Sequence, residues 1–114
     1  MTTIYGIKNC DTMKKAFNWL DENGIEYNFH DYKKDSPDTA VLEKAIATHG
    51  WETVINQRGT TWRKLDDAVK ESMDADKAIP LALENPSILK RPLLTHNGTT
   101  HIGFKPEIYS NILL

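Results

Sequence analysis

The sequence is poor in cysteine, in net charge and in long apolar runs, and each shortage excludes a class of protein. Its 114 residues contain one cysteine, Cys10, so the chain cannot form an internal disulfide. With no signal peptide either, we expect a cytoplasmic protein whose thiol stays reduced. A net charge of −2 argues against broad nucleic-acid binding, which needs a basic surface. No apolar run is long enough to predict a membrane span.

The remaining composition is typical of a globular protein, with 39% hydrophobic and 26% charged residues. A chain of this length can bury a core without disulfides. We therefore expect one domain over residues 1–114, and a monomer. Only two histidines, His96 and His101, are predicted to share a sheet face. Two such ligands without a third make a poor metal site, so none is expected.

The first third of the chain alternates between strand and helix periodicity. Residues 1–6 predict a strand that ends at Gly6, and residues 25–32 predict a second strand by their alternating pattern. Between them, apolar residues spaced i, i+3, i+4 and i+7 predict an amphipathic helix that ends at Gly24. These apolar residues are Met13, Ala16, Phe17 and Leu20. Cys10 is therefore expected where the first strand passes into this helix.

The middle of the chain predicts helices that are short and interrupted. Ser36 is expected to cap a helix that has Pro37 in its first position and ends at Gly50. Residues 51–85 predict further helical pieces separated by breaks. Pro80 predicts that the last piece begins only shortly before it, because proline is tolerated in the first turn of a helix and disrupts later turns.

The end of the chain carries the clearest local signal. Asn97 and Gly98 lie between two β-prone runs and predict a two-residue hairpin. Residues 105–114 predict a closing helix, with Pro106 in its first turn. The second half of the chain therefore adds an antiparallel strand pair and one more helix.

The order of these elements predicts the architecture. A strand, a helix and a second strand give a parallel start, and the hairpin adds an antiparallel pair. This is an α/β, thioredoxin-like fold, with a four-stranded mixed sheet flanked by helices. Residues 1–33 and 87–114 are expected to form the thioredoxin-like core. Residues 36–86 are expected to form a mostly helical insert between the second strand and the C-terminal hairpin.

The position of Cys10 favours a reactive thiol over a buried packing cysteine. Only the thiolate attacks, and the partial positive charge at the start of a helix favours an anion there. Lys8 adds cationic charge and the Thr12 hydroxyl can donate to the sulfur, whereas Asp11 opposes a second anion. Met13 stands where a Cys-x-x-Cys site has its second cysteine. An external thiol must therefore restore Cys10, and glutathione, directly or through a glutaredoxin, is the expected donor.

Two stretches far from Cys10 add cations and a fixed turn. "NQRGTTWRKL" places Arg58 before a glycine in an expected loop, and "ILKRPLL" places Arg91 directly before Pro92. A proline at the start of a strand, after a polar loop, is a candidate for a cis peptide bond. Taken alone, each arginine is more often a solvated surface residue.

Together these motifs resemble the ArsC family, which contains glutaredoxin-linked arsenate reductases and Spx-type regulators. The segments are "IYGIKNCDTMKKA", "NQRGTTWRKL", "NPSILKRPLL" and "IGFKPEIY", in the order and spacing of the family. The cysteine segment and the C-terminal segment are most similar to the YffB-like branch. The resemblance covers nearly the whole chain. It implies a thioredoxin-like fold, a catalytic Cys10, active-site arginines at Arg58 and Arg91, and a cis proline at Pro92.

The chain departs from the arsenate reductases at two places. Lys105 stands where the third active-site arginine of the family is expected, and lysine lacks the two-pronged geometry with which arginine binds an oxyanion. The histidine that these reductases carry shortly before the cysteine is absent from "YGIKNC". Contacts to glutathione or to a small oxidised or anionic substrate are expected from Lys8, Asn9, Thr12, Pro92 and Lys105.

The function that these residues favour is a glutathione-dependent thiol reductase or thiol-disulfide oxidoreductase. Cys10 would be its nucleophile, and Arg58 and Arg91 would hold the anionic part of the substrate. No bound cofactor is expected, because glutathione would be a co-substrate. The alternatives are a glutaredoxin-linked arsenate reductase and, from another class, a Spx-type regulator that binds RNA polymerase. A redox-inert thioredoxin-like binding module is a third alternative.

Overall fold

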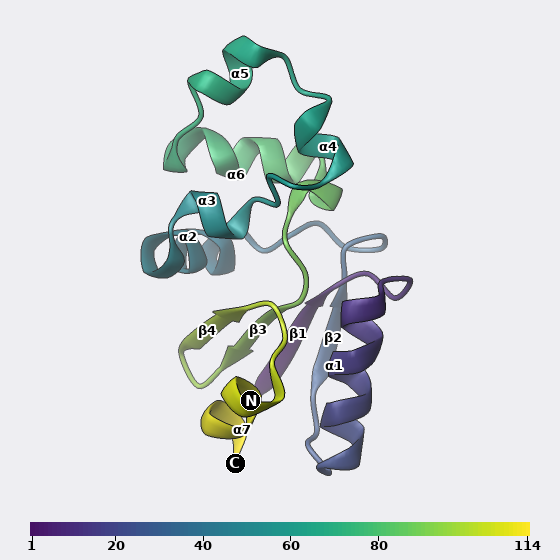
Figure 1. The fold of residues 1–114 in the computed structure, drawn as a ribbon. Coiled ribbons are helices and arrows are strands. Elements are labelled where there is room, and N and C mark those ends of the chain that lie inside the picture. Colours follow the sequence, from purple (N-terminus) through teal and green to yellow (C-terminus); the bar gives the residue numbers. More distant parts are fainter. The chain divides into compact units, whose positions relative to one another are not determined.

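The computed structural model describes all residues, 1–114, and groups them into two compact units (Figure 1). The sheet unit consists of Met1–Asp35 and Arg91–Leu114, and the helical unit consists of Ser36–Lys90. None of the helices in either unit has both the length and the hydrophobicity that crossing a bilayer requires.

Four strands form the mixed sheet of the sheet unit, in the order β2-β1-β3-β4. The strands are β1 (Thr2–Gly6), β2 (Asn28–Asp31), β3 (Leu93–His96) and β4 (Thr99–Ile102). Strand β1 runs parallel to β2 and antiparallel to β3, which runs antiparallel to β4. The predicted α/β, thioredoxin-like fold with a four-stranded mixed sheet is therefore confirmed.

Strand β2 begins three residues later than its alternating pattern predicts. The backbone N–H of Ile25 donates to the carbonyl of Leu20 at 3.0 Å, so the chain stays attached to the end of the preceding helix. Only from Asn28 onward does it pair with β1. This local hydrogen bond belongs to the Schellman-type end of the helix, and it outweighs the strand propensity of residues 25–27.

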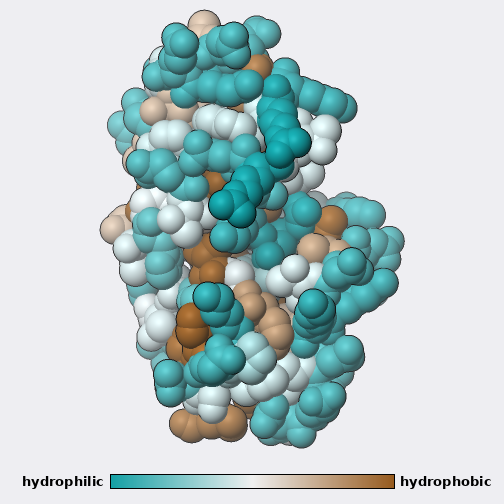
Figure 2. Space-filling model, viewed as in Figure 1, coloured by the Kyte–Doolittle hydropathy of each residue, from teal (hydrophilic) through white to brown (hydrophobic).

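Two helices supply the core of the sheet unit, α1 (Asp11–Glu22) and α7 (Pro106–Leu113) (Figure 1). Ile4 of β1 lies opposite Leu94 of β3, and both point to the side where these helices pack. The buried cluster comprises Ile4, Met13, Ala16, Leu20, Leu94 and Tyr109. The outward face of α1 is hydrophilic (Figure 2). Its one-sided apolar pattern is therefore what attaches α1 to the sheet.

The glycine and turn predictions in this unit are confirmed. Gly24 follows α1 with a φ of 65°, the left-handed conformation expected after a helix end. Asn97 and Gly98 have φ values of 46° and 87°, as the two-residue hairpin between β3 and β4 requires. Pro106 is the first residue of α7, where its missing N–H leaves no hydrogen bond unmade.

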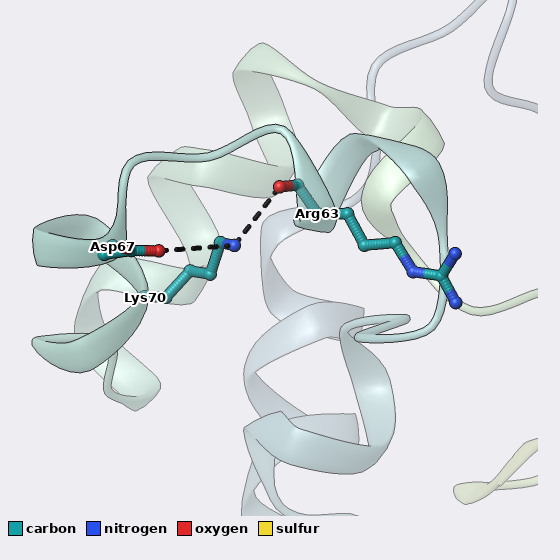
Figure 3. A network of polar contacts seen from close by, with 3 residues as sticks. All are labelled: Arg63, Asp67 and Lys70. Atoms are coloured by element: carbon teal, nitrogen blue, oxygen red, sulfur yellow. Dashed lines mark hydrogen bonds and ion pairs between the residues drawn. The ribbon is translucent and has the colours of Figure 1, made fainter.

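The helical unit contains short, broken helices, as predicted. They are α2 (Thr39–His49), α3 (Trp51–Val54), α4 (Thr60–Arg63), α5 (Asp67–Glu71), α6 (Ala75–Glu84) and the 3-10 turn η1 (Pro86–Ile88). An isolated bridge pairs Ile55 with Leu89, which joins the segment after α3 to the end of the unit. The Lys70 ammonium donates to the Arg63 carbonyl at 3.2 Å and pairs with Asp67 at 3.8 Å (Figure 3).

Two helix starts in this unit differ from the predictions. Asp38 rather than Ser36 caps α2, because its carboxylate accepts from the backbone N–H of Val41 at 3.3 Å. Pro80 lies in the middle of α6 rather than in its first turn. The Asp74 carboxylate accepts from the backbone N–H of Lys77 at 2.8 Å and starts the helix earlier.

Buried tyrosines make the protein sensitive to alkaline pH. Burial raises the pKa of Tyr109 above its usual value near 10. Burial also raises the pKa of Tyr32, and the nearby Tyr5 phenol adds to that increase. Each phenol therefore stays protonated in the folded chain at a pH where the unfolded chain ionises. Stability is retained below pH 10 and falls as the pH rises further, by about 1 kcal/mol per tyrosine between pH 10 and 11.

Urea unfolding at pH 9, 10 and 11 measures this loss. Tyr109→Phe should remove the share that belongs to Tyr109, at the expense of the 3.2 Å hydrogen bond from its hydroxyl to the Gly103 carbonyl. Between pH 10 and 11, we expect the free energy of unfolding of this variant to fall by about 1 kcal/mol less than that of the wild type. An equal loss in both proteins would contradict the assignment.

Candidate functional site

Cys10 occupies the N-cap position of α1. After β1 ends at Gly6, the exposed residues Lys8 and Asn9 form a bend, and Cys10 has the extended φ and ψ of −137° and 129°. Its carbonyl accepts the first helical hydrogen bond, from the backbone N–H of Lys14 at 3.0 Å. Its side chain makes no capping hydrogen bond. The half-buried sulfur is thus placed at the start of a helix whose first N–H groups have no capping oxygen.

The first turn of α1 packs closely over Gly6. A Cβ atom at Gly6 would lie 2.6 Å from the Met13 sulfur and 3.5 Å from the Arg91 Cβ. A larger residue at Gly6 would therefore force the end of the buried Met13 side chain to move. The same contacts bring Arg91 next to the strand that leads to Cys10. Met13, which stands where a Cys-x-x-Cys site has its second cysteine, is fully buried. It is therefore a core residue.

The peptide bond between Arg91 and Pro92 is cis, as predicted from the sequence. The Pro92 carbonyl accepts from the backbone N–H of Gly103 at 2.8 Å. Leu93 pairs with both Tyr5 of β1 and Ile102 of β4. Neighbouring strands therefore flank β3 on both sides.

Tyr32 is a neighbour of Arg91 that sequence reasoning missed. It follows β2 directly, is buried, and its backbone N–H donates to the Gly6 carbonyl at 2.8 Å. The positive charge of Arg91 acts to lower the pKa of Tyr32, against the larger effect of burial. The signal that could have found it is the parallel pairing of β1 and β2, which brings their carboxyl ends together.

Arg58 belongs to the helical unit, where it lines a polar pocket of about 400 Å³ together with Lys90. Its side chain is exposed, and its backbone N–H donates to the Asn56 side-chain carbonyl at 3.2 Å. The Asn56 N–H donates to the Ile88 carbonyl and the Lys90 N–H to the Val54 carbonyl. These bonds fix the Arg58 loop against the last residues of the unit.

Lys105 and Thr12 complete the predicted set. Thr12 is half-buried in the first turn of α1, directly after Cys10 and Asp11. Lys105 is the exposed N-cap residue of α7. That helix contacts α1 through Tyr109 and Trp19, whose rings meet edge to face at 5.7 Å. Trp19 lies in the second half of α1, away from the turn that carries Cys10.

The topology and the place of Cys10 define a class of protein. It is a thioredoxin-like domain with one cysteine at the start of its first helix and a cis proline before its third strand. The chain belongs to the ArsC family, described as such by a family model that matches residues 5–112. It is thus an arsenate reductase-related protein with the fold of a thiol oxidoreductase.

Solved structures and a curated relative agree with this placement. The chain is 52% identical to the YFFB (PA3664) protein, with a TM-score of 0.95 and full coverage of both chains. It is 50% identical to an arsenate reductase (ArsC) related protein from Brucella melitensis, with a TM-score of 0.75, covering 96% of this chain and 92% of the other. It is also 27% identical to the regulatory protein MgsR of Bacillus subtilis, covering 91% and 83%.

Proposed function

We propose that this protein is a glutathione-dependent thiol-disulfide oxidoreductase that uses Cys10 as its nucleophile. The observation that carries the proposal is the position of the lone cysteine at the uncapped start of α1. Serine, threonine, aspartate and asparagine are the usual residues there, because their oxygens accept from the first N–H groups. A thiolate in that position receives the partial positive charge of the helix start.

The reaction consists of two thiol-disulfide exchanges. The Cys10 thiolate attacks the glutathione sulfur of a mixed disulfide, a Cys10–glutathione bond forms, and the other thiol leaves with the electron pair. A second glutathione, directly or through a glutaredoxin, then attacks this bond. It releases oxidised glutathione and restores Cys10. An external thiol is required because Met13 is buried in the core and no second cysteine exists.

Cations are proposed to hold the carboxylates of glutathione. Arg91 lies beside Gly6 near the strand that leads to Cys10, and Arg58 occupies a loop that is fixed by hydrogen bonds. The planar guanidinium binds a carboxylate with two parallel hydrogen bonds. Lys105 supplies a point charge that is less selective. Lys8, Asn9, Thr12 and Pro92 are proposed to supply further contacts to glutathione or to the substrate.

The test is a comparison of Cys10 in the folded and the unfolded chain. Incubation with oxidised glutathione at pH 7 should yield one glutathione adduct per chain by mass spectrometry. Iodoacetamide should alkylate the folded chain several times faster than the chain in urea, because the helix start favours the thiolate. The absence of an adduct, together with slower alkylation of the folded chain, would rule out the proposal.

A glutaredoxin-linked arsenate reductase is the second candidate. It is favoured by the 50% identity to the arsenate reductase (ArsC) related protein of Brucella melitensis. Lys105 in place of the third arginine and the absence of a histidine from "YGIKNC" disfavour it. Arsenate turnover coupled to glutathione and glutaredoxin would establish it.

A regulator that binds RNA polymerase is a further candidate, favoured by the likeness to the regulatory protein MgsR. A Spx-type switch commonly uses a Cys-x-x-Cys pair, which Met13 removes from this chain. The regulator is also distinguishable without any assay of turnover. Capture of RNA polymerase that survives Cys10→Ser would favour it over both enzymes.

A further inference from the structure

Three aromatic side chains of the sheet unit line an apolar groove that the proposed reaction leaves without a role. The groove measures about 380 Å³ and is lined by Lys8, Phe17, Tyr27 and Phe29. It lies where α1 and β2 are neighbours (Figure 1). This volume falls within the range of small-molecule pockets, which combine apolar walls with a few polar groups.

The groove has a defined and ordered wall. The Phe17 ring stacks on Tyr27 with centroids 5.8 Å apart and meets Phe29 edge to face at 5.0 Å. Burial raises the pKa of Tyr27, and the negative charge of the nearby Asp21 carboxylate adds to that shift. All three aromatic side chains are only partly buried, so their remaining surface faces the groove.

The groove lies on the same side of α1 as Cys10. Phe17 is seven residues beyond Cys10, which in a helix is within about 20° of two full turns and about 10 Å along the axis. Both residues pack against the same core cluster. Lys8 lines the groove and precedes Cys10 by two residues. A mixed disulfide whose glutathione sulfur lies at Cys10 can therefore extend its other half along α1 into the groove.

We propose that this groove binds the leaving half of the mixed disulfide, an arylalkyl thiol that carries an acidic group. The aromatic wall matches the aryl part, and Lys8 is complementary to the acid. This inference rests on the proposed attack of Cys10 on the glutathione sulfur. In that step the bond between the two sulfurs of the substrate breaks. The arylalkyl thiolate leaves with the electron pair and takes a proton from water.

The test compares two mixed disulfides of glutathione, one with phenylmethanethiol and one with 2-mercaptoethanol, which are thiols of similar acidity. The wild type should show about tenfold higher kcat/KM for the aryl substrate, because a phenyl group is partly buried in the groove. Tyr27→Ala should reduce the ratio of the two kcat/KM values to between about one and three. Tyr27→Phe should leave the ratio near that of the wild type. Ile112→Ala, which removes apolar bulk from the same core on α7, serves as the matched control and should also keep the ratio.

The acidic group is tested with the mixed disulfide of 4-(mercaptomethyl)benzoate. Lys8→Gln should lower kcat/KM for this substrate by about two- to fivefold relative to the phenylmethanethiol substrate. Lys34→Gln, a change at an exposed lysine after β2, should leave that ratio unchanged. An unchanged ratio in Lys8→Gln would remove the acidic group from the proposal.

The failure of this inference is distinguishable from the failure of the proposed function. Equal kcat/KM for the aryl and hydroxyethyl substrates, with turnover of both, would reject the groove and leave the oxidoreductase in place. A second measurement needs no turnover. Cys10→Ser should bind S-benzylglutathione about tenfold more tightly than S-methylglutathione in calorimetric titrations, and equal affinities would overturn the inference.

Discussion

Replacing Cys10 with serine is expected to abolish turnover of glutathione mixed disulfides without weakening the fold. The alcohol is not ionised at neutral pH and forms no disulfide, so kcat/KM should fall by at least about a thousandfold. Serine is a preferred N-cap residue, however, and the cysteine makes no capping hydrogen bond. The variant should therefore gain up to about 1 kcal/mol in its free energy of unfolding. A coupled assay of glutathione oxidation and urea unfolding measure the two effects.

Cys10→Ala is the matched control for this prediction, because alanine lacks both the thiol and the capping oxygen. It should be as inactive as Cys10→Ser and less stable than it by about 1 kcal/mol. The comparison separates the chemistry of the sulfur from the structural role of the N-cap. Activity of Cys10→Ser within tenfold of the wild type would show that the sulfur is not the nucleophile.

Local signals were sufficient to predict most of the sheet unit. Asn97 and Gly98 need left-handed backbone angles that few other residues adopt, so the hairpin could be placed to the residue. Pro106 and Gly24 marked helix ends for similar reasons. In the helical unit Ser36 was a misleading signal, because Asp38, two residues later, also carries an oxygen that can cap a helix. The structure uses Asp38 to cap α2 and Asp74 to cap α6, and each carboxylate accepts from the backbone N–H three residues later.

The sequence located the reactive part of the site but not its surroundings. The change from strand to helix periodicity placed Cys10 at the start of α1, where the structure has it. The close approach of Met13 and Arg91 to Gly6 depends on how α1 and the Arg91 segment pack. The spacing of residues in the sequence does not predict this packing. The same holds for Tyr32, which lies close to Arg91 because β1 pairs with β2. Tertiary packing, rather than local propensity, builds this part of the site.

Removing the charge of Arg91 is expected to produce the second-largest loss of activity. Arg91→Met keeps an unbranched chain that can pack beside Gly6 and removes the guanidinium. Because hydrogen bonds to charged groups contribute about 1.5–3 kcal/mol, kcat/KM should fall by about ten- to a hundredfold. Arg91→Lys should lose less, since it keeps the charge without the two-pronged geometry. The matched control is Arg63→Met, whose exposed guanidinium points away from the Asp67–Lys70 pair (Figure 3) and which should stay within about twofold of the wild type.

Combining substitutions at Arg58 and Arg91 tests whether the two residues bind the same anion. Arg58→Met alone should lower kcat/KM by about ten- to a hundredfold, as for Arg91→Met. If both guanidinium groups hold the same carboxylate, the second substitution should have less effect once the first has been made. The double variant should then retain more activity than the product of the two single losses predicts. Losses that multiply would assign the two arginines to separate anions, and an active Arg58→Met would remove Arg58 from the site.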